Sequence, residues 1–183
     1  MRYDTDVIIV GAGVGGLVLA LSLHQAGIAC RVYEAVPEIK PLGVGINLLP
    51  HATRELDELG LLPTLDAIAV RTRESVFYTR HGQFIYGEPA GLDAGYDWPQ
   101  YSIHRGDLQM ALWAAVRQRL GDDCVTVNAR CTGVEQDADT VTARFKDNNG
   151  NALPPVRGRI AVGCDGIHSC LLYTSDAADE GLG

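Results

Sequence analysis

The most constraining feature of this 183-residue chain is a glycine-rich turn between two regular segments near its beginning. Residues 7–10 form an apolar, β-branched run that predicts a short strand, and residues 17–26 have the apolar spacing of a helix that ends at Gly27. A second apolar run at residues 30–33 predicts another strand. This order predicts a β-α-β unit and therefore a parallel sheet in an α/β fold.

The turn matches the pattern G-x-G-x-x-G, with glycines at Gly11, Gly13, Gly15 and Gly16. Gly11 permits the tight turn, Gly13 lets a pyrophosphate approach the backbone, and Gly16 lets the helix pack closely on the strand. The helix N-terminus also offers N–H groups and the positive end of its dipole to an anion. The turn therefore predicts a dinucleotide site, and the alternative is a glycine turn with a purely structural role.

An acidic residue, Glu34, directly follows the second predicted strand. A carboxylate at this place accepts hydrogen bonds from ribose hydroxyls and disfavours a 2′-phosphate, so NADP is the weaker choice for the nucleotide held here. FAD and NAD both fit the pattern.

Charge and cysteine content exclude several other classes of protein. The chain has 15 basic and 23 acidic residues, and a net charge of −8 argues against a nucleic-acid partner. The uncharged run 7–23 contains four glycines and follows two aspartates, which disfavours a signal peptide or a membrane span. The five cysteines include no C-x-x-C pair, so we expect no metal site and no disulfide framework, but free thiols in a reducing cytoplasm.

The rest of the chain predicts a mixture of strands and helices. A second glycine-bearing loop at residues 42–47 precedes a helix that ends at Gly60, and Gly45 either approaches a ligand or only turns the chain. We also expect a hairpin at 76–86 and a helix at 107–120, with Trp113 and Leu120 in the core. The last expected element is an antiparallel meander that crosses back to the main sheet, with strands at 125–127, 133–135, 140–145 and 160–163.

Three ordered motifs resemble those of the single-component FAD-dependent aromatic monooxygenases. They are the glycine turn with Glu34, the segment Tyr101 to Gln109, and the segment Gly163 to Ser169, which contains Asp165-Gly166. Within that family the chain is most similar to the phenazine-modifying members, through residues 41–47 and 101–109. The resemblance extends from about residue 3 to residue 169.

This resemblance implies a Rossmann-like FAD-binding fold with a parallel sheet and an antiparallel β-meander. It places FAD at the glycine turn, with Glu34 on the adenosine ribose and Arg105 near the ribityl–phosphate region, and it includes Gly45 and Asp165 among the cofactor-binding residues. A guanidinium suits this role because it forks onto phosphate or hydroxyl oxygens. The implied co-substrates are NAD(P)H, O2 and a small aromatic molecule, and no catalytic acid or base is assigned.

The resemblance also implies a domain organisation. Residues 1–70 and 101–169 would form the FAD-binding domain, and residues 71–100 would be a hairpin and loop of a substrate domain that is otherwise largely missing. Residues 170–183 depart from the family pattern, which has a basic residue soon after the Asp-Gly motif, and they resemble translated sequencing-adaptor sequence. We expect this tail to be non-native, with a genuine short terminus as the alternative.

Two other functions remain open at this point. A related flavoprotein, such as a halogenase or a reductase, would share the glycine turn. A stand-alone NAD-binding module would need neither Arg105 nor Asp165-Gly166. If the chain is the expected fragment of a monooxygenase, it should bind FAD weakly and hydroxylate nothing.

Overall fold

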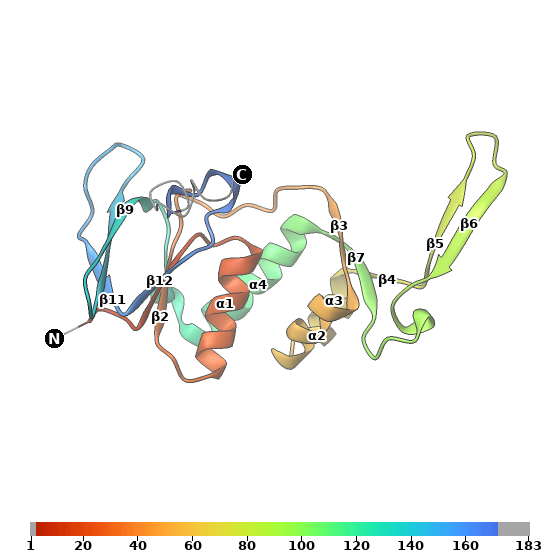
Figure 1. Ribbon diagram of the computed structural model, residues 1–183, viewed down its shortest axis with the longest axis horizontal. Coiled ribbons are helices and arrows are strands. Elements are labelled where there is room, and N and C mark those ends of the chain that lie inside the picture. Colours follow the sequence, from red (N-terminus) through yellow and green to blue (C-terminus); the bar gives the residue numbers. More distant parts are fainter. Residues whose placement is uncertain (1–2, 172–183) are drawn as a thin grey trace. The chain divides into compact units, whose positions relative to one another are not determined.

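The computed structural model describes residues 3–171. The chain divides into two compact units, a first unit of residues 1–40 and 112–183 and a second unit of residues 41–111 (Figure 1). The two units are defined by contacts between residues, and they do not test which residues bind FAD and which bind substrate. The domain organisation expected from the sequence therefore stays a prediction. Most of the tail that we expect to be non-native, residues 172–183, lies outside the described residues.

The first unit contains a helix, seven strands and two short 3-10 turns within its described residues. They are α1 (Val14–Gln25), β1 (Val7–Val10), β2 (Cys30–Tyr33), β8 (Val125–Thr126), β9 (Arg130–Gln136), β10 (Val141–Lys146), β11 (Val156–Gly158), β12 (Ile160–Gly163), η2 (Asp122–Cys124) and η3 (Gly166–His168). Helix α4 (Arg105–Leu120) contains the boundary between the two units.

The expected β-α-β unit is confirmed almost residue by residue. Strands β1 and β2 pair in parallel, and the complete sheet has the order β12-β1-β2-β8. All four residues of β1 are buried, as expected for the central strand of a parallel sheet covered on both faces. Helix α1 contacts β1 and β2 and buries Leu17, Ala20 and Leu21.

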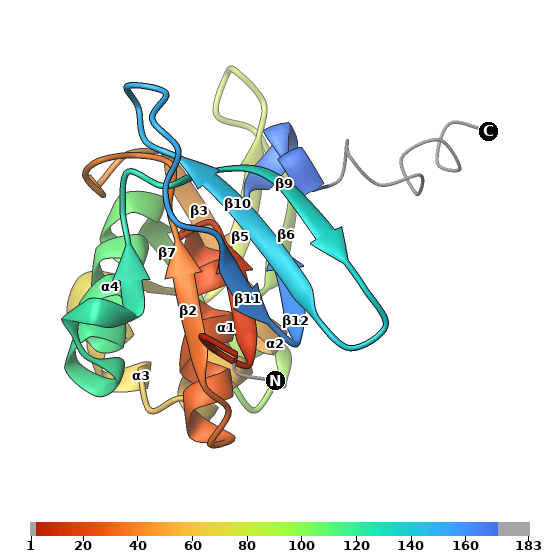
Figure 2. The same cartoon turned by 90° about the vertical axis from the view of Figure 1, so that its left-hand side faces the viewer.

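An antiparallel sheet of order β11-β10-β9 packs on the parallel sheet (Figure 2). Ile8, Val10 and Tyr33 share a core with residues of this second sheet, including Phe145, whose ring stacks on that of Tyr33 at a centroid distance of 4.4 Å. The expected meander is therefore present, and β12 returns to the main sheet. The placement of residues 125–127 in the meander is wrong, because β8 is a parallel edge strand beside β2.

The second unit carries a three-stranded antiparallel sheet, a two-stranded hairpin and short helices. Its elements are β3 (Gly45–Leu48), β4 (Val70–Thr72), β5 (Glu74–Tyr78), β6 (Phe84–Pro89), β7 (Gln100–His104), α2 (Pro50–Glu58), α3 (Leu62–Ile68) and η1 (Gly91–Ala94). The sheet has the order β3-β7-β4, and β5 and β6 form the expected hairpin.

Two expectations for the middle of the chain are wrong. Residues 45–47 are not loop but belong to β3, because they pair with β7 from Gly45 opposite His104 to Leu48 opposite Tyr101. Trp113 and Leu120 are half-buried rather than in the core, whereas Leu112 and Val116 of the same helix are fully buried.

A buried tyrosine ties a helix to the sheet of the second unit. Tyr101 of β7 donates a hydrogen bond to Asp66 of α3 at 2.5 Å, and Arg71 of β4 donates two more to the same carboxylate at 2.7 Å. Burial and the Asp66 carboxylate raise the pKa of Tyr101 to about 12. The hydroxyl therefore stays protonated and keeps donating throughout the physiological pH range.

No helix among residues 3–171 is both long enough and apolar enough to cross a membrane.

We predict that Phe145→Ala lowers the free energy of unfolding by about 3–5 kcal/mol, because it leaves a cavity between the two sheets of the first unit. Urea denaturation followed by circular dichroism measures this change. The matched control is Phe84→Ala in the hairpin, where the ring is 65% exposed and the cost should be at most about 1 kcal/mol. Equal losses for the two variants would contradict the core that we describe.

Candidate functional site

The glycine turn joins β1 to α1 at the carboxyl end of the parallel sheet. Gly11 has φ of +104°, and a Cβ atom there would lie 2.4 Å from the carbonyl oxygen of Cys164, which follows β12. A Cβ atom at Gly16 would lie 2.0 Å from the carbonyl oxygen of Gly11. Both positions therefore require glycine, because any side chain would push apart the two strand ends and the first turn of α1.

The other two glycines of the turn border open space. An added Cβ atom at Gly13 or Gly15 would meet nothing within 4 Å among the described residues, apart from its chain neighbours and the adjoining helix backbone. Gly13 is the N-cap of α1, and no side chain of the described residues caps it. The first turn of α1 thus leaves room for a ligand group at the positive end of the helix dipole.

The carboxylate of Glu34 lies beside this turn. It follows β2, is half-buried, and accepts hydrogen bonds from the backbone N–H of Ala12 at 2.7 Å and of Val36 at 3.0 Å. A carboxylate has about four acceptor sites, so these two bonds fix its position and leave it able to accept more. The sequence places Glu34 at the end of β2, but it does not show the bond to Ala12, which is a contact between residues distant in the chain.

Asp165 approaches the same turn from β12. Its Cα atom would be 3.0 Å from a Cβ atom at Gly11. One carboxylate oxygen accepts a hydrogen bond from the backbone N–H of Cys170 at 2.8 Å, while the other, Oδ1, is buried and has no hydrogen-bond partner among the described residues. A buried acceptor without a partner is costly, and it indicates a place where a ligand could donate.

The second unit brings together the remaining two predicted residues. Arg105 begins α4 and donates from its side chain to the carbonyl of Leu42 at 3.3 Å, while its backbone N–H donates to Val44 at 3.0 Å. Gly45 begins β3 directly after this loop. The side chain of Arg105 also lies against Gly43, which has φ of +135°. A Cβ atom added at Gly43 would be 2.6 Å from the Nε of Arg105.

Two residues next to Arg105 hold the same loop and were not singled out from the sequence. The ring Nε2 of His104 is 3.1 Å from the carbonyl oxygen of Gly43. A Cβ atom at Gly106 would lie 2.6 Å from the backbone of Pro41. Both lie within the segment Tyr101 to Gln109, and that motif is the sequence signal that could have found them.

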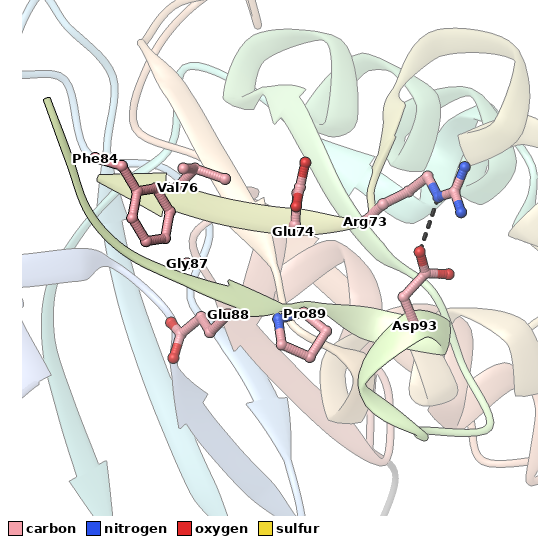
Figure 3. A pocket seen from close by; sticks show the side chains of 8 residues that line it. All are labelled: Arg73, Glu74, Val76, Phe84, Gly87, Glu88, Pro89 and Asp93. Atoms are coloured by element: carbon pink, nitrogen blue, oxygen red, sulfur yellow. Dashed lines mark hydrogen bonds and ion pairs between the residues drawn. The ribbon is translucent and has the colours of Figure 1, made fainter. Parts of the chain in front are cut away.

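The hairpin of the second unit borders a cavity of about 620 Å³ (Figure 3). Val76, Phe84 and Pro89 give it an apolar side, and an ion pair of 2.8 Å joins Arg73 to Asp93 at one end. Both strands are largely exposed, with Phe77 53% and Tyr86 52% accessible to solvent. An exposed aromatic surface of this kind is typical of a region that is covered by another part of a protein or by a ligand.

The predicted site residues thus form two groups, one in each unit. The first group consists of Gly11, Gly13, Gly15, Gly16, Glu34 and Asp165, and the second of Gly45 and Arg105. The first group has the elements of a nucleotide site: an open helix N-terminus, a fixed carboxylate and a buried free acceptor. Within residues 3–171 no three His, Cys, Asp or Glu side chains gather as a metal site.

Comparison with known protein families gives one match over nearly the whole chain. Residues 4–178 match the model of a family described as "FAD binding domain". The match includes both groups of predicted site residues.

Individual relatives agree with this family. The chain is 43% identical over 170 residues to the phenazine 1,6-dicarboxylic acid hydroxylase of Lysobacter antibioticus, covering 92% of this chain and 42% of that protein. It is 33% identical over 180 residues to the 3-hydroxybenzoate 6-hydroxylase of Polaromonas naphthalenivorans, covering 96% and 44%. The chain therefore spans about two-fifths of the length of these relatives.

Solved structures show the same fold. Klebsiella pneumoniae HpxO in complex with FAD and uric acid matches with a TM-score of 0.76 at 28% identity, covering 93% of this chain and 41% of that one. The p-nitrophenol 4-monooxygenase of Pseudomonas putida matches with a TM-score of 0.80 at 23% identity, covering 91% and 42%. The expected α/β fold with parallel and antiparallel sheets is thereby confirmed.

We predict that Gly16→Ala lowers the melting temperature of the protein, because its Cβ atom would overlap the Gly11 carbonyl and separate α1 from β1. Gly15→Ala is the matched control in the same helical turn. Its Cβ atom meets open space, so it should leave the stability unchanged or raise it by up to about 1 kcal/mol. Thermal unfolding measures both variants, and a similar loss for the two would contradict the close packing at Gly16.

Proposed function

Because the chain belongs to the FAD binding domain family, we propose that it is the FAD-binding part of a monooxygenase that uses NAD(P)H and O2 to hydroxylate an aromatic substrate. The observation that carries this proposal is the bond from the Ala12 N–H to Glu34, which fixes a carboxylate beside an open helix N-terminus. The names of the phenazine and hydroxybenzoate hydroxylases support the aromatic class of substrate.

The residues of the first group fit an adenine dinucleotide. The N-terminus of α1, with Gly13 and Gly15 facing open space, would bind the pyrophosphate, and Glu34 would accept hydrogen bonds from the adenosine ribose. Asp165 would accept a hydrogen bond at its free Oδ1 from a hydroxyl or N–H group of the cofactor. Gly11 and Gly16 would act indirectly, by holding these three parts together.

For the residues of the second group, the family resemblance supports a role in binding FAD on its flavin side. Arg105 would present its guanidinium to phosphate or hydroxyl oxygens, and its bond to Leu42 would hold the loop that precedes Gly45. Bound FAD supplies the redox chemistry, accepting hydride from NAD(P)H and activating O2. The chain's own part is to bind and orient the cofactor, and we assign no catalytic acid or base.

We further propose that residues 71–100 belong to the part of the protein that binds the substrate. The exposed aromatic side chains of β5 and β6 and the cavity beside them support this role. A cytoplasmic location is also part of the proposal, and the five free thiols support a reducing compartment.

We predict that Glu34→Gln weakens FAD binding by about tenfold or more, because a neutral amide loses the charged hydrogen bonds to ribose, each worth about 1.5–3 kcal/mol. Quenching of flavin fluorescence on titration with the purified chain measures the dissociation constant. Glu38→Gln is the matched control, since Glu38 pairs only at the surface with Lys40 at 2.9 Å. An unchanged affinity in Glu34→Gln would remove Glu34 from the site.

A second variant separates this proposal from a stand-alone NAD-binding module. Arg105→Ala should weaken FAD binding at least several-fold while leaving NAD binding unchanged, because NAD has no flavin side for Arg105 to contact. Calorimetric titration with each nucleotide measures the difference. If Arg105→Ala leaves FAD affinity intact, the flavin role of the second group is wrong.

A further inference from the structure

Two thiols meet at the amino end of the parallel sheet, away from the glycine turn. Cys30 begins β2, and Cys124 ends η2 directly before β8. The two strands pair in parallel with Val32 opposite Val125, which brings both cysteines to the same end. The Cys124 thiol donates to the backbone carbonyl of Cys30 at 3.7 Å, the Cys30 thiol donates to that of Ala20 at 3.8 Å, and each thiol shifts the pKa of the other.

A cavity of about 330 Å³ gives access to this pair. Its lining includes both cysteines, together with His24, Arg31 and Arg119. Cys30 is half-buried and Cys124 is 8% exposed, so a reagent would reach the pair by way of this cavity.

The two thiols differ in their readiness to ionise. The hydrogen bond from the Cys30 thiol lowers the pKa of Cys124, and the positive charge of Arg31 lowers it further against the effect of burial. The same contact and burial raise the pKa of Cys30. Because the thiolate is the reactive form of cysteine, and because Cys124 shares its cavity with the Arg31 cation and contacts the backbone of Cys30, Cys124 is the nucleophile of the pair and Cys30 is placed to react second.

We propose that Cys30 and Cys124 form an oxidisable dithiol site that reacts with hydrogen peroxide to give an intramolecular disulfide. The Cys124 thiolate attacks one peroxide oxygen, the O–O bond breaks, and the products are a sulfenic acid on Cys124 and hydroxide. The Cys30 sulfur then attacks the Cys124 sulfur, the S–O bond breaks, and the Cys30 proton leaves with the released hydroxide as water. The peroxide is reduced to water by the two electrons of the thiol pair.

The other cysteines are less suited to this reaction. Cys131 and Cys170 also contact each other, but burial raises the pKa of Cys170 to about 12, and Cys131 lies in the core between the two sheets. Burial also raises the pKa of Cys164. The thiols of Cys170 and Cys164 therefore stay protonated under conditions in which Cys124 reacts.

The position of the pair determines what the disulfide would change. It would join residues 94 positions apart in the sequence and so constrain the unfolded chain, which stabilises the folded one. It lies at the opposite end of β2 from Glu34. Oxidation should therefore raise the melting temperature and leave FAD affinity unchanged, which keeps this inference independent of the proposed function.

The test treats the reduced 183-residue chain with hydrogen peroxide, blocks the remaining thiols and maps the peptides by mass spectrometry without reduction. We expect a peptide pair linked through Cys30 and Cys124, a loss of two of the five free thiols, and a rise in melting temperature that dithiothreitol reverses. No thiol loss, or a link between Cys131 and Cys170 instead, would overturn the proposal.

Variants test the order of the two steps. Cys30→Ser should stop at a sulfenic acid on residue 124, which dimedone traps, and Cys124→Ser should lose the reaction. Cys164→Ser is the matched control and should form the disulfide at the wild-type rate. The assignment of Cys124 as the nucleophile would be contradicted if, in the Cys124→Ser variant, dimedone labelled Cys30 as fast as the wild type is oxidised.

Discussion

The structure of the first unit depends on the close approach of three backbone segments at Gly11. The end of β1, the first turn of α1 and the residue after β12 meet there so closely that a methyl group at Gly11 or Gly16 would lie 2.4 Å or less from a carbonyl oxygen. This contact brings the N-terminus of α1, Glu34 and Asp165 to one place at the carboxyl end of the parallel sheet. In α/β folds that edge is where ligands bind, since the helix N-termini and the loops converge on it.

The local part of this arrangement could be predicted from the sequence. β1, α1 and β2 are encoded by neighbouring residues, namely a β-branched run, a glycine turn and a second apolar run, so their bounds were predicted to within a few residues. The hairpin around Gly82 was equally local, and its glycine has φ of +80°. The roles of Gly11 and Gly16 as sites of close packing follow from the same pattern.

The non-local part could not be predicted. Residues 45–48 carry a glycine and an asparagine, which are depleted in strands, and their place in β3 is set by pairing with β7. Residues 125–126 join the parallel sheet for the same reason, through pairing with β2. The bond from Ala12 to Glu34, the free Oδ1 of Asp165 and the meeting of Cys30 with Cys124 likewise join residues that are far apart in the chain, so no local pattern shows them.

The central claim is that the first unit binds an adenine dinucleotide at the glycine turn. Amide chemical shifts recorded by NMR during a titration with FAD test it directly, residue by residue. The account predicts that the largest changes fall on residues 11–16, on Glu34 and its neighbours, and on residues 164–166, with none at Cys30 or Cys124. Saturable changes centred elsewhere, or no changes up to the highest FAD concentration that can be reached, would contradict it.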